Sequence, residues 1–156
     1  MTADLATSVS EAEATLLREL SIGAAISAVK GATALAWGVG FSDGWCRGFG
    51  RQTLGWAAIN GAIAAVGHHG LKTNAEDPTA RARKLRTTLV VNSALDVGYI
   101  AAGVAVARSK HPRFADAHGD GVAVVVQGLF LFWLDARHAF RFQALLNEHR
   151  ATATPD

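Results

Sequence analysis

The segment Gly121–Leu134 reads GVAVVVQGLFLFWL, and it decides the class of fold. It contains no charged residue, and its last six residues, Leu129–Leu134, would place apolar side chains on every side of a helix. A helix of a water-soluble four-helix bundle needs a polar face over roughly half of its circumference to meet water. The absence of such a face favours a helix inside a lipid bilayer.

Three further apolar runs precede this segment. Each has at most one charged residue, and they are Leu20–Phe41, Thr53–Gly67 and Thr87–Ala107. About 20 residues of helix cross the apolar core of a bilayer, so the first and third runs are long enough by themselves. The second and fourth runs reach that length only with interfacial ends, where Arg51 and Arg137 can extend toward water. We therefore predict an all-α integral membrane protein, an antiparallel bundle of four transmembrane helices.

Length and composition fit one domain. The chain has 156 residues, of which 18% are charged, whereas about a quarter are charged in an ordinary soluble domain. We expect a single transmembrane domain over residues 1–156, with short cytoplasmic tails at 1–15 and 142–156. The single cysteine, Cys46, excludes an internal disulfide and a multi-Cys metal site. The net charge of +2, spread along the chain, argues against a nucleic-acid partner.

Local signals mark where helices begin. Ser10 and Glu13 have the spacing of a capping box, which predicts that the first helix begins near Glu11. Asp77 stands before Pro78, and this pair is typical of an N-cap followed by the first helical residue. The third helix is therefore expected to begin near Pro78.

The loops and basic residues predict the orientation. The glycine-containing segments Ser42–Gly44 and His118–Gly121 are expected to be loops. With both termini inside, nine Lys and Arg residues lie on the cytoplasmic side and five on the other side. No signal-peptide pattern opens the chain. We therefore predict a multi-pass protein of the bacterial cytoplasmic membrane, with both termini in the cytoplasm.

Each apolar run has a polar residue near its middle. In chain order these residues are Lys30, Asn60, Asp96 and Gln127. A charged side chain at the bilayer centre costs roughly 2.5 to 3.5 kcal/mol, so Lys30 and Asp96 should face inward and pair with each other. Asn60 and Gln127 can donate and accept hydrogen bonds around this pair. The sequence thus predicts a buried polar cluster at mid-depth.

Other polar residues extend this cluster. Asn92, Asp96 and Tyr99 lie at positions i, i+4 and i+7, so they share one face of the third helix. Asp135 follows Gln127 toward the cytoplasmic end of the fourth helix. Ionisable residues inside a membrane indicate a functional site by default, and the alternative is a polar network that only fixes helix register.

Two segments carry a resemblance to a known family. Asn92–Ile100 and Gln127–Asp135 resemble the N-x-x-L-D-V-x-Y-I and Q-G-x-F-L-x-x-x-D segments of a family of uncharacterised bacterial four-helix membrane proteins. The resemblance is strong over the C-terminal third and looser around Trp56 and Asn60. It implies the fold and no reaction. It also implies inward polar positions, which are Asn60, Asn92, Asp96, Tyr99, Gln127 and Asp135.

Small residues recur at spacings of four in three runs. They are Gly23, Ser27 and Gly31, then Ala57, Gly61 and Ala65, then Ala94, Gly98 and Ala102. In lipid, such stripes let helix backbones approach closely. We expect most of them to pack within the bundle, which leaves one stripe available for a homodimer.

Histidines raise the question of a cofactor. His68, His69 and His138 are all expected at the cytoplasmic ends of helices, where an axial haem pair is conceivable. Histidines at helix ends more commonly cap carbonyls or contact lipid head groups. His111 and His118 are expected on the opposite side. We therefore predict no cofactor, no metal and, because no nucleophile or catalytic motif is present, no catalytic residue.

Two classes of function remain open. The first is an accessory or structural membrane protein in which the polar cluster is a packing device, and the lack of a substrate signature favours it. The second is a small proton- or ion-coupled transporter or channel acting as a homodimer, and a haem-binding protein or membrane enzyme comes third. A packing device predicts a dry, fully paired cluster, whereas transport predicts that water or a ligand reaches Asp96. The sequence does not identify a small-molecule or ion ligand.

Overall fold

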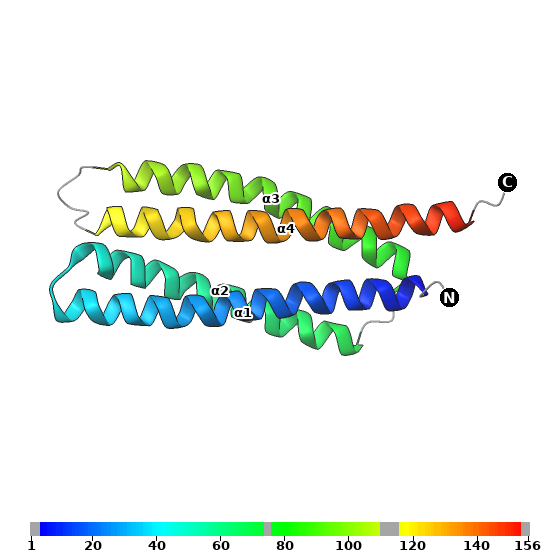
Figure 1. Ribbon diagram of the computed structural model, residues 1–156, viewed down its shortest axis with the longest axis horizontal. Coiled ribbons are helices and arrows are strands. Elements are labelled where there is room, and N and C mark those ends of the chain that lie inside the picture. The colour runs from blue at the N-terminus through cyan, green and yellow to red at the C-terminus, as the bar shows by residue number, and fades with distance from the viewer. Residues whose placement is uncertain (1–3, 74–75, 110–115, 154–156) are drawn as a thin grey trace.

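Four antiparallel helices make up the protein. The computed structural model describes residues 4–73, 76–109 and 116–153, and these form α1 (Leu5–Gly40), α2 (Gly44–Thr73), α3 (Pro78–Ala107) and α4 (Ala117–Ala153). The α1–α2 hairpin lies beside the α3–α4 hairpin, with both termini at the same end of the bundle (Figure 1). No strand occurs in the described ranges. The predicted all-α four-helix bundle is confirmed.

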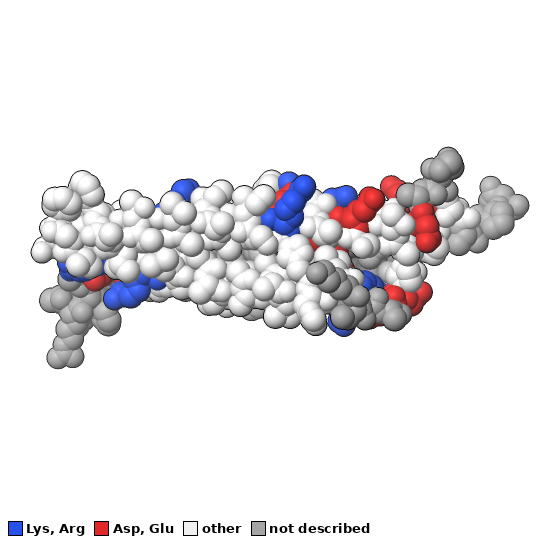
Figure 2. Space-filling view, turned by 90° about the horizontal axis from the view of Figure 1, so that it is seen from below, with Lys and Arg blue, Asp and Glu red and all other residues white. Residues whose placement is uncertain are grey.

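An apolar belt surrounds the bundle. Three helices, α1, α3 and α4, are long and apolar enough to cross a membrane, whereas α2, with 30 residues, is long enough but contains no continuous stretch of comparable hydropathy. Large apolar side chains are exposed on all four helices, among them Ile26, Ile63, Val97 and Trp133. Figure 2 shows charged side chains near the loop end and over the half that carries the termini, with a nearly uncharged stretch between them. Because water does not favour such a surface, the belt identifies an integral membrane protein.

The helices are longer than a bilayer requires. With 36 and 37 residues, α1 and α4 are each roughly 55 Å long, against an apolar core of about 30 Å. The excess lies at the end of the termini, where Val9 and Ala12 of α1 pack with Ala82 of α3 and with Phe142 and Leu146 of α4 in one buried cluster. The segments expected to be short tails are therefore largely helical and form part of the core.

The predicted start of α1 is wrong. The helix begins at Leu5 instead of near Glu11. The capping box does not form, because Glu13 turns its carboxylate to the guanidinium of Arg81 in α3, at 2.7 Å. Burial of Val9 against the other helices favours one further turn and a half of helix before Glu11.

The three other boundary predictions had different outcomes. The loop expected at 42–44 is confirmed to within one residue, because α1 ends at Gly40 and α2 begins at Gly44. The predicted start of α3 is confirmed, since the side chain of Asp77 accepts a hydrogen bond from the backbone N–H of Ala80 at 2.8 Å. In contrast, the segment 118–121 is helical and not a loop. A Cβ atom on Gly119 would meet the backbone of α2, and one on Gly121 would meet the backbone of α3. These glycines therefore permit close helix packing and do not form a turn.

Ion pairs join α2 to α4 near the loop end. Arg47 contacts Asp116 at 3.1 Å, and Arg51 contacts Asp120 at 2.7 Å. Two of the five basic residues expected on the outer side are thus paired with aspartates. The two aspartates offset two of the positive charges at that end of the molecule.

The small-residue stripes are divided between inner and outer surfaces. Gly31 of α1 packs closely against Gly50 of α2, and Gly23 faces the ring of Phe130 in α4. The α3 stripe is exposed, and a Cβ atom on Gly98 would meet no other atom within 4 Å. The α1 stripe therefore serves packing within the chain, as expected.

Two glycines of α2 offer a matched test of this packing. In Gly50→Ala the new methyl group would meet the backbone of Gly31 and Leu35, whereas in Gly61→Ala it would meet nothing within 4 Å. We expect Gly50→Ala to destabilise the protein by about 1–3 kcal/mol through overpacking. Gly61→Ala should leave stability unchanged or raise it, because alanine favours helix. Thermal unfolding in detergent measures both, and equal effects would contradict the close α1–α2 contact.

Candidate ligand-binding cavity

A cavity lies between α2 and α3. The helix α1 packs along α2, α3 packs along α4, and α2 also contacts α4, but in the described residues α2 and α3 do not pack against each other. The space between them has a volume of about 510 Å³ and is lined by residues of all four helices. This volume falls in the range of about 300–1,000 Å³ that is usual for small-molecule sites.

The walls of the cavity are mainly apolar. Leucine and isoleucine side chains form most of the lining, among them Leu16, Leu20, Ile59, Ile63, Leu89 and Leu131. Four polar side chains interrupt this lining near the middle of the bundle: Asn60, Asn92, Asp96 and Asp135. No lysine or arginine is among the described residues that line it. Near the middle of the bundle the wall therefore combines two carboxyl groups with two amides.

Two of these polar side chains are buried without a complete set of partners. Asn60 is 2% exposed and Asp96 is 3% exposed. Among the described protein groups, neither Nδ2 of Asn60 nor Oδ2 of Asp96 has a hydrogen-bond partner. Asp135 differs in that its carboxyl group interacts with the side chain of Asn92. A buried polar group without a partner costs roughly 1–3 kcal/mol, so both side chains would be stabilised by a group that reached these atoms.

An aromatic pair closes the end of the cavity nearer the loops. The rings of Trp56 in α2 and Tyr99 in α3 meet edge to face, with centroids 5.4 Å apart. This contact bridges the two helices that otherwise stand apart. Tyr99 is 43% exposed, so part of its ring also meets the surroundings of the bundle.

A buried ion pair marks the opposite end. Glu13 lines the cavity and contacts Arg81, with side chains only 10% and 13% exposed. One turn and a half further along α1, Glu19 binds two residues of α4: Arg137 at 2.6 Å and His138 at 3.1 Å. These contacts fix α1 to α3 and α4 on the side of the termini.

The structure corrects the expected role of Lys30. This residue is exposed on α1, so its predicted inward orientation and its pairing with Asp96 are wrong. The buried positions of this part of α1 are Ala24, Gly31 and Gly38, which recur every seven residues. Lys30 lies about 100° around the helix from Gly31 and therefore points away from the bundle. Its long side chain can extend toward the membrane surface.

The remaining predicted residues fall into two groups. Four of them are buried: Asn60, Asp96, Gln127 and Asp135. Asn92 and Tyr99 are exposed but line the cavity on the same face of α3 as Asp96. Gln127 does not line the cavity, although it is 5% exposed and its Nε2 atom also lacks a described partner. The assignment of these residues to a functional site remains a prediction.

The predicted histidines do not gather. His138 is fully buried and turns Nε2 to Glu19, and His68 and His69 lie on α2 outside the cavity lining. His111 lies outside the described residues. Among the described residues, no three His, Cys, Asp or Glu side chains are grouped so that they could hold a metal ion.

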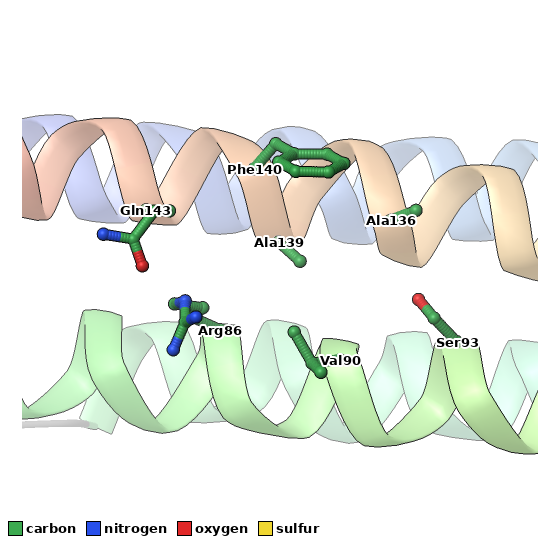
Figure 3. Close-up of a pocket in the computed structure, with 7 residues that line it drawn as sticks. All are labelled: Arg86, Val90, Ser93, Ala136, Ala139, Phe140 and Gln143. Carbon is green, nitrogen blue, oxygen red and sulfur yellow. The ribbon is translucent and has the colours of Figure 1, made fainter.

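A second, smaller hollow lies on the outer surface between α3 and α4. It measures about 240 Å³, and Figure 3 shows Arg86 and Gln143 at one end and Ser93 at the other. Phe140, on its rim, is 77% exposed. The hollow contains no carboxyl group and no buried polar atom without a partner, so the cavity between α2 and α3 is the stronger candidate site.

The fold and the apolar belt define an all-α integral membrane protein whose bundle contains a mainly apolar cavity with polar side chains in its wall. The chain belongs to the family of unknown function DUF6992, which matches residues 20–136. No curated protein and no solved structure matches. The match includes the polar residues of the cavity wall, and it excludes Glu13 and the buried C-terminal part of α4.

Proposed function

We propose that this membrane protein binds a small molecule in the cavity between α2 and α3. The observation that carries the proposal is that two residues lining the cavity, Asn60 and Asp96, are buried with an unpartnered polar atom each, Nδ2 and Oδ2. A packing device would be dry and fully paired, because a half-satisfied polar network destabilises a core. The free atoms therefore favour binding over the accessory role that the sequence favoured.

The test is a thermal-stability screen of small molecules on the protein in nanodiscs. A bound ligand raises the unfolding temperature of a protein that binds it only when folded. The variant Asn60→Leu should lose the stabilisation found with the wild type. Gln127→Leu is the matched control, because it also removes a buried amide with a free N–H but lies outside the cavity. Stabilisation that survives Asn60→Leu, or that Gln127→Leu abolishes equally, would contradict a site in this cavity.

A transporter that works as a homodimer is the second candidate. The exposed stripe of Ala94, Gly98 and Ala102 on α3 supports it, because small residues facing lipid allow two bundles to approach closely. A disulfide between two Gly98→Cys chains, together with proton flux that Asp96→Asn abolishes, is the expected result. Absence of both would remove this candidate.

We also propose that the protein lies in a bacterial cytoplasmic membrane with both termini inside. The excess of basic residues on that side supports this orientation. In a Cys46→Ser background, a cysteine at Ser109 should react with an impermeant maleimide in intact cells. A cysteine at Thr79 should react only after lysis. Labelling of both positions from the same side would contradict the topology.

A further inference from the structure

We infer that the ligand is an amphiphilic amine, a protonated amino group on an apolar body, with a hydroxyl or carbonyl oxygen near the nitrogen. This inference rests on the proposed binding function and names its ligand class. It follows from the charge of the cavity, from the two free atoms of residues that line it, from the aromatic pair and from the direction in which the cavity opens.

The charge of the wall selects a cation. Asp96 and Asp135 are the acidic groups near its middle, Glu13 lies at one end, and no described lysine or arginine lines it. A buried negative charge is costly unless a positive group pairs with it. An anionic ligand would add to the repulsion between the two carboxyl groups, whereas an ammonium group would relieve it.

The two free atoms specify complementary groups on the ligand. Oδ2 of Asp96 is an acceptor and can take a hydrogen bond from a protonated amine. Nδ2 of Asn60 is a donor and needs an oxygen acceptor. A quaternary ammonium has no N–H, and a simple alkylamine has no oxygen, so neither class satisfies both atoms. A secondary amine with a nearby hydroxyl satisfies both.

The aromatic pair adds to the recognition of a cation. The faces of tryptophan and tyrosine rings carry negative potential and attract ammonium groups. Trp56 and Tyr99 line the same cavity as Asp96 and Asp135, and their edge-to-face contact uses only one face of one ring.

The cavity opens toward the apolar belt. Ile59 and Ile63 of α2 and Leu95 of α3 line the cavity and are each more than half exposed. The gap between these two helices therefore faces lipid. An amphiphile can enter sideways from the bilayer, with its apolar body against the leucine and isoleucine walls and its amino group at Asp96.

Four probes of similar size test this inference on the wild-type protein in nanodiscs of neutral phosphatidylcholine. They are N-hexylethanolamine, which carries both groups, octylamine, which lacks the oxygen, 1,2-octanediol, which is neutral, and octyl sulfate, which is anionic. We expect N-hexylethanolamine to raise the unfolding temperature most and to bind about tenfold more tightly than octylamine, since each hydrogen bond contributes roughly a factor of ten. The diol can form the same hydrogen bonds but carries no charge, so it should bind more weakly than N-hexylethanolamine, and the sulfate should have no effect.

Two variants locate the binding. Asp96→Asn should weaken the binding of N-hexylethanolamine by about 10- to 100-fold. The control Asp120→Asn removes a carboxylate paired with Arg51 at the loop end and should leave this affinity unchanged. Asn60→Leu should erase the difference between N-hexylethanolamine and octylamine. If Asp96→Asn does not fold, the inference is tested by the relative affinities of the four probes for the wild-type protein. If the diol or the sulfate bound more tightly than the amines, and Asn60→Leu abolished that binding, the inferred class of ligand would be wrong and the proposed function would stand. If no probe and no molecule of the wider screen stabilises the protein, both fall.

Discussion

Replacing Arg81 with methionine is expected to lower the free energy of unfolding by about 3–5 kcal/mol, because it leaves the carboxylate of Glu13 buried without its partner. The double variant Glu13→Leu with Arg81→Met removes both charges and should recover much of this loss. Chemical or thermal unfolding of the four members of the cycle measures the coupling.

A surface pair provides the comparison. Lys84 and Glu76 are 3.9 Å apart, and the lysine side chain is 73% exposed. Screening by water makes such pairs weak, so Lys84→Met should change stability little. Additive penalties in the Glu13–Arg81 cycle, or equal losses for Arg81→Met and Lys84→Met, would show that the buried pair does not connect α1 to α3 as the structure indicates.

The second large effect concerns the C-terminal part of α4. Phe142 is fully buried in the cluster with Val9 and Ala82, so Phe142→Ala should cost about 3–5 kcal/mol through lost burial and the cavity that remains. Phe140 is 77% exposed two residues earlier, and Phe140→Ala should cost little. Comparable losses for both variants, or none for Phe142→Ala, would mean that this part of α4 is a tail after all.

The sequence predicted the depth of polar residues better than their direction. The apolar runs gave the four helices, and Asn60, Asp96, Gln127 and Asp135 are all buried. Lys30 has the same depth but points outward, because the small residue beside it, Gly31, occupies the face that meets α2. Which face of a helix is buried depends on its neighbours, and a run of alanine and glycine gives little indication of it.

Contacts between residues far apart in the sequence could not be predicted either. Glu13 has the spacing of a capping residue, yet it pairs with Arg81, 68 positions later. Glu19 likewise reaches Arg137 and His138 in α4. Neither pair leaves a local signal. The cavity itself depends on α2 and α3 standing apart, which is a property of the packing of all four helices.

The gap between α2 and α3 affects how any affinity for this protein is to be measured. A ligand that reaches the cavity through the gap must first dissolve in the bilayer, so its relevant concentration is its mole fraction in the lipid. At a fixed total amount of ligand, adding lipid dilutes it and shifts the apparent Kd upward. A chemical modification of the ligand that changes only its partition coefficient then changes the apparent Kd as well. Apparent Kd values from preparations with different lipid-to-protein ratios become comparable only after each is expressed as a mole fraction of ligand in the lipid.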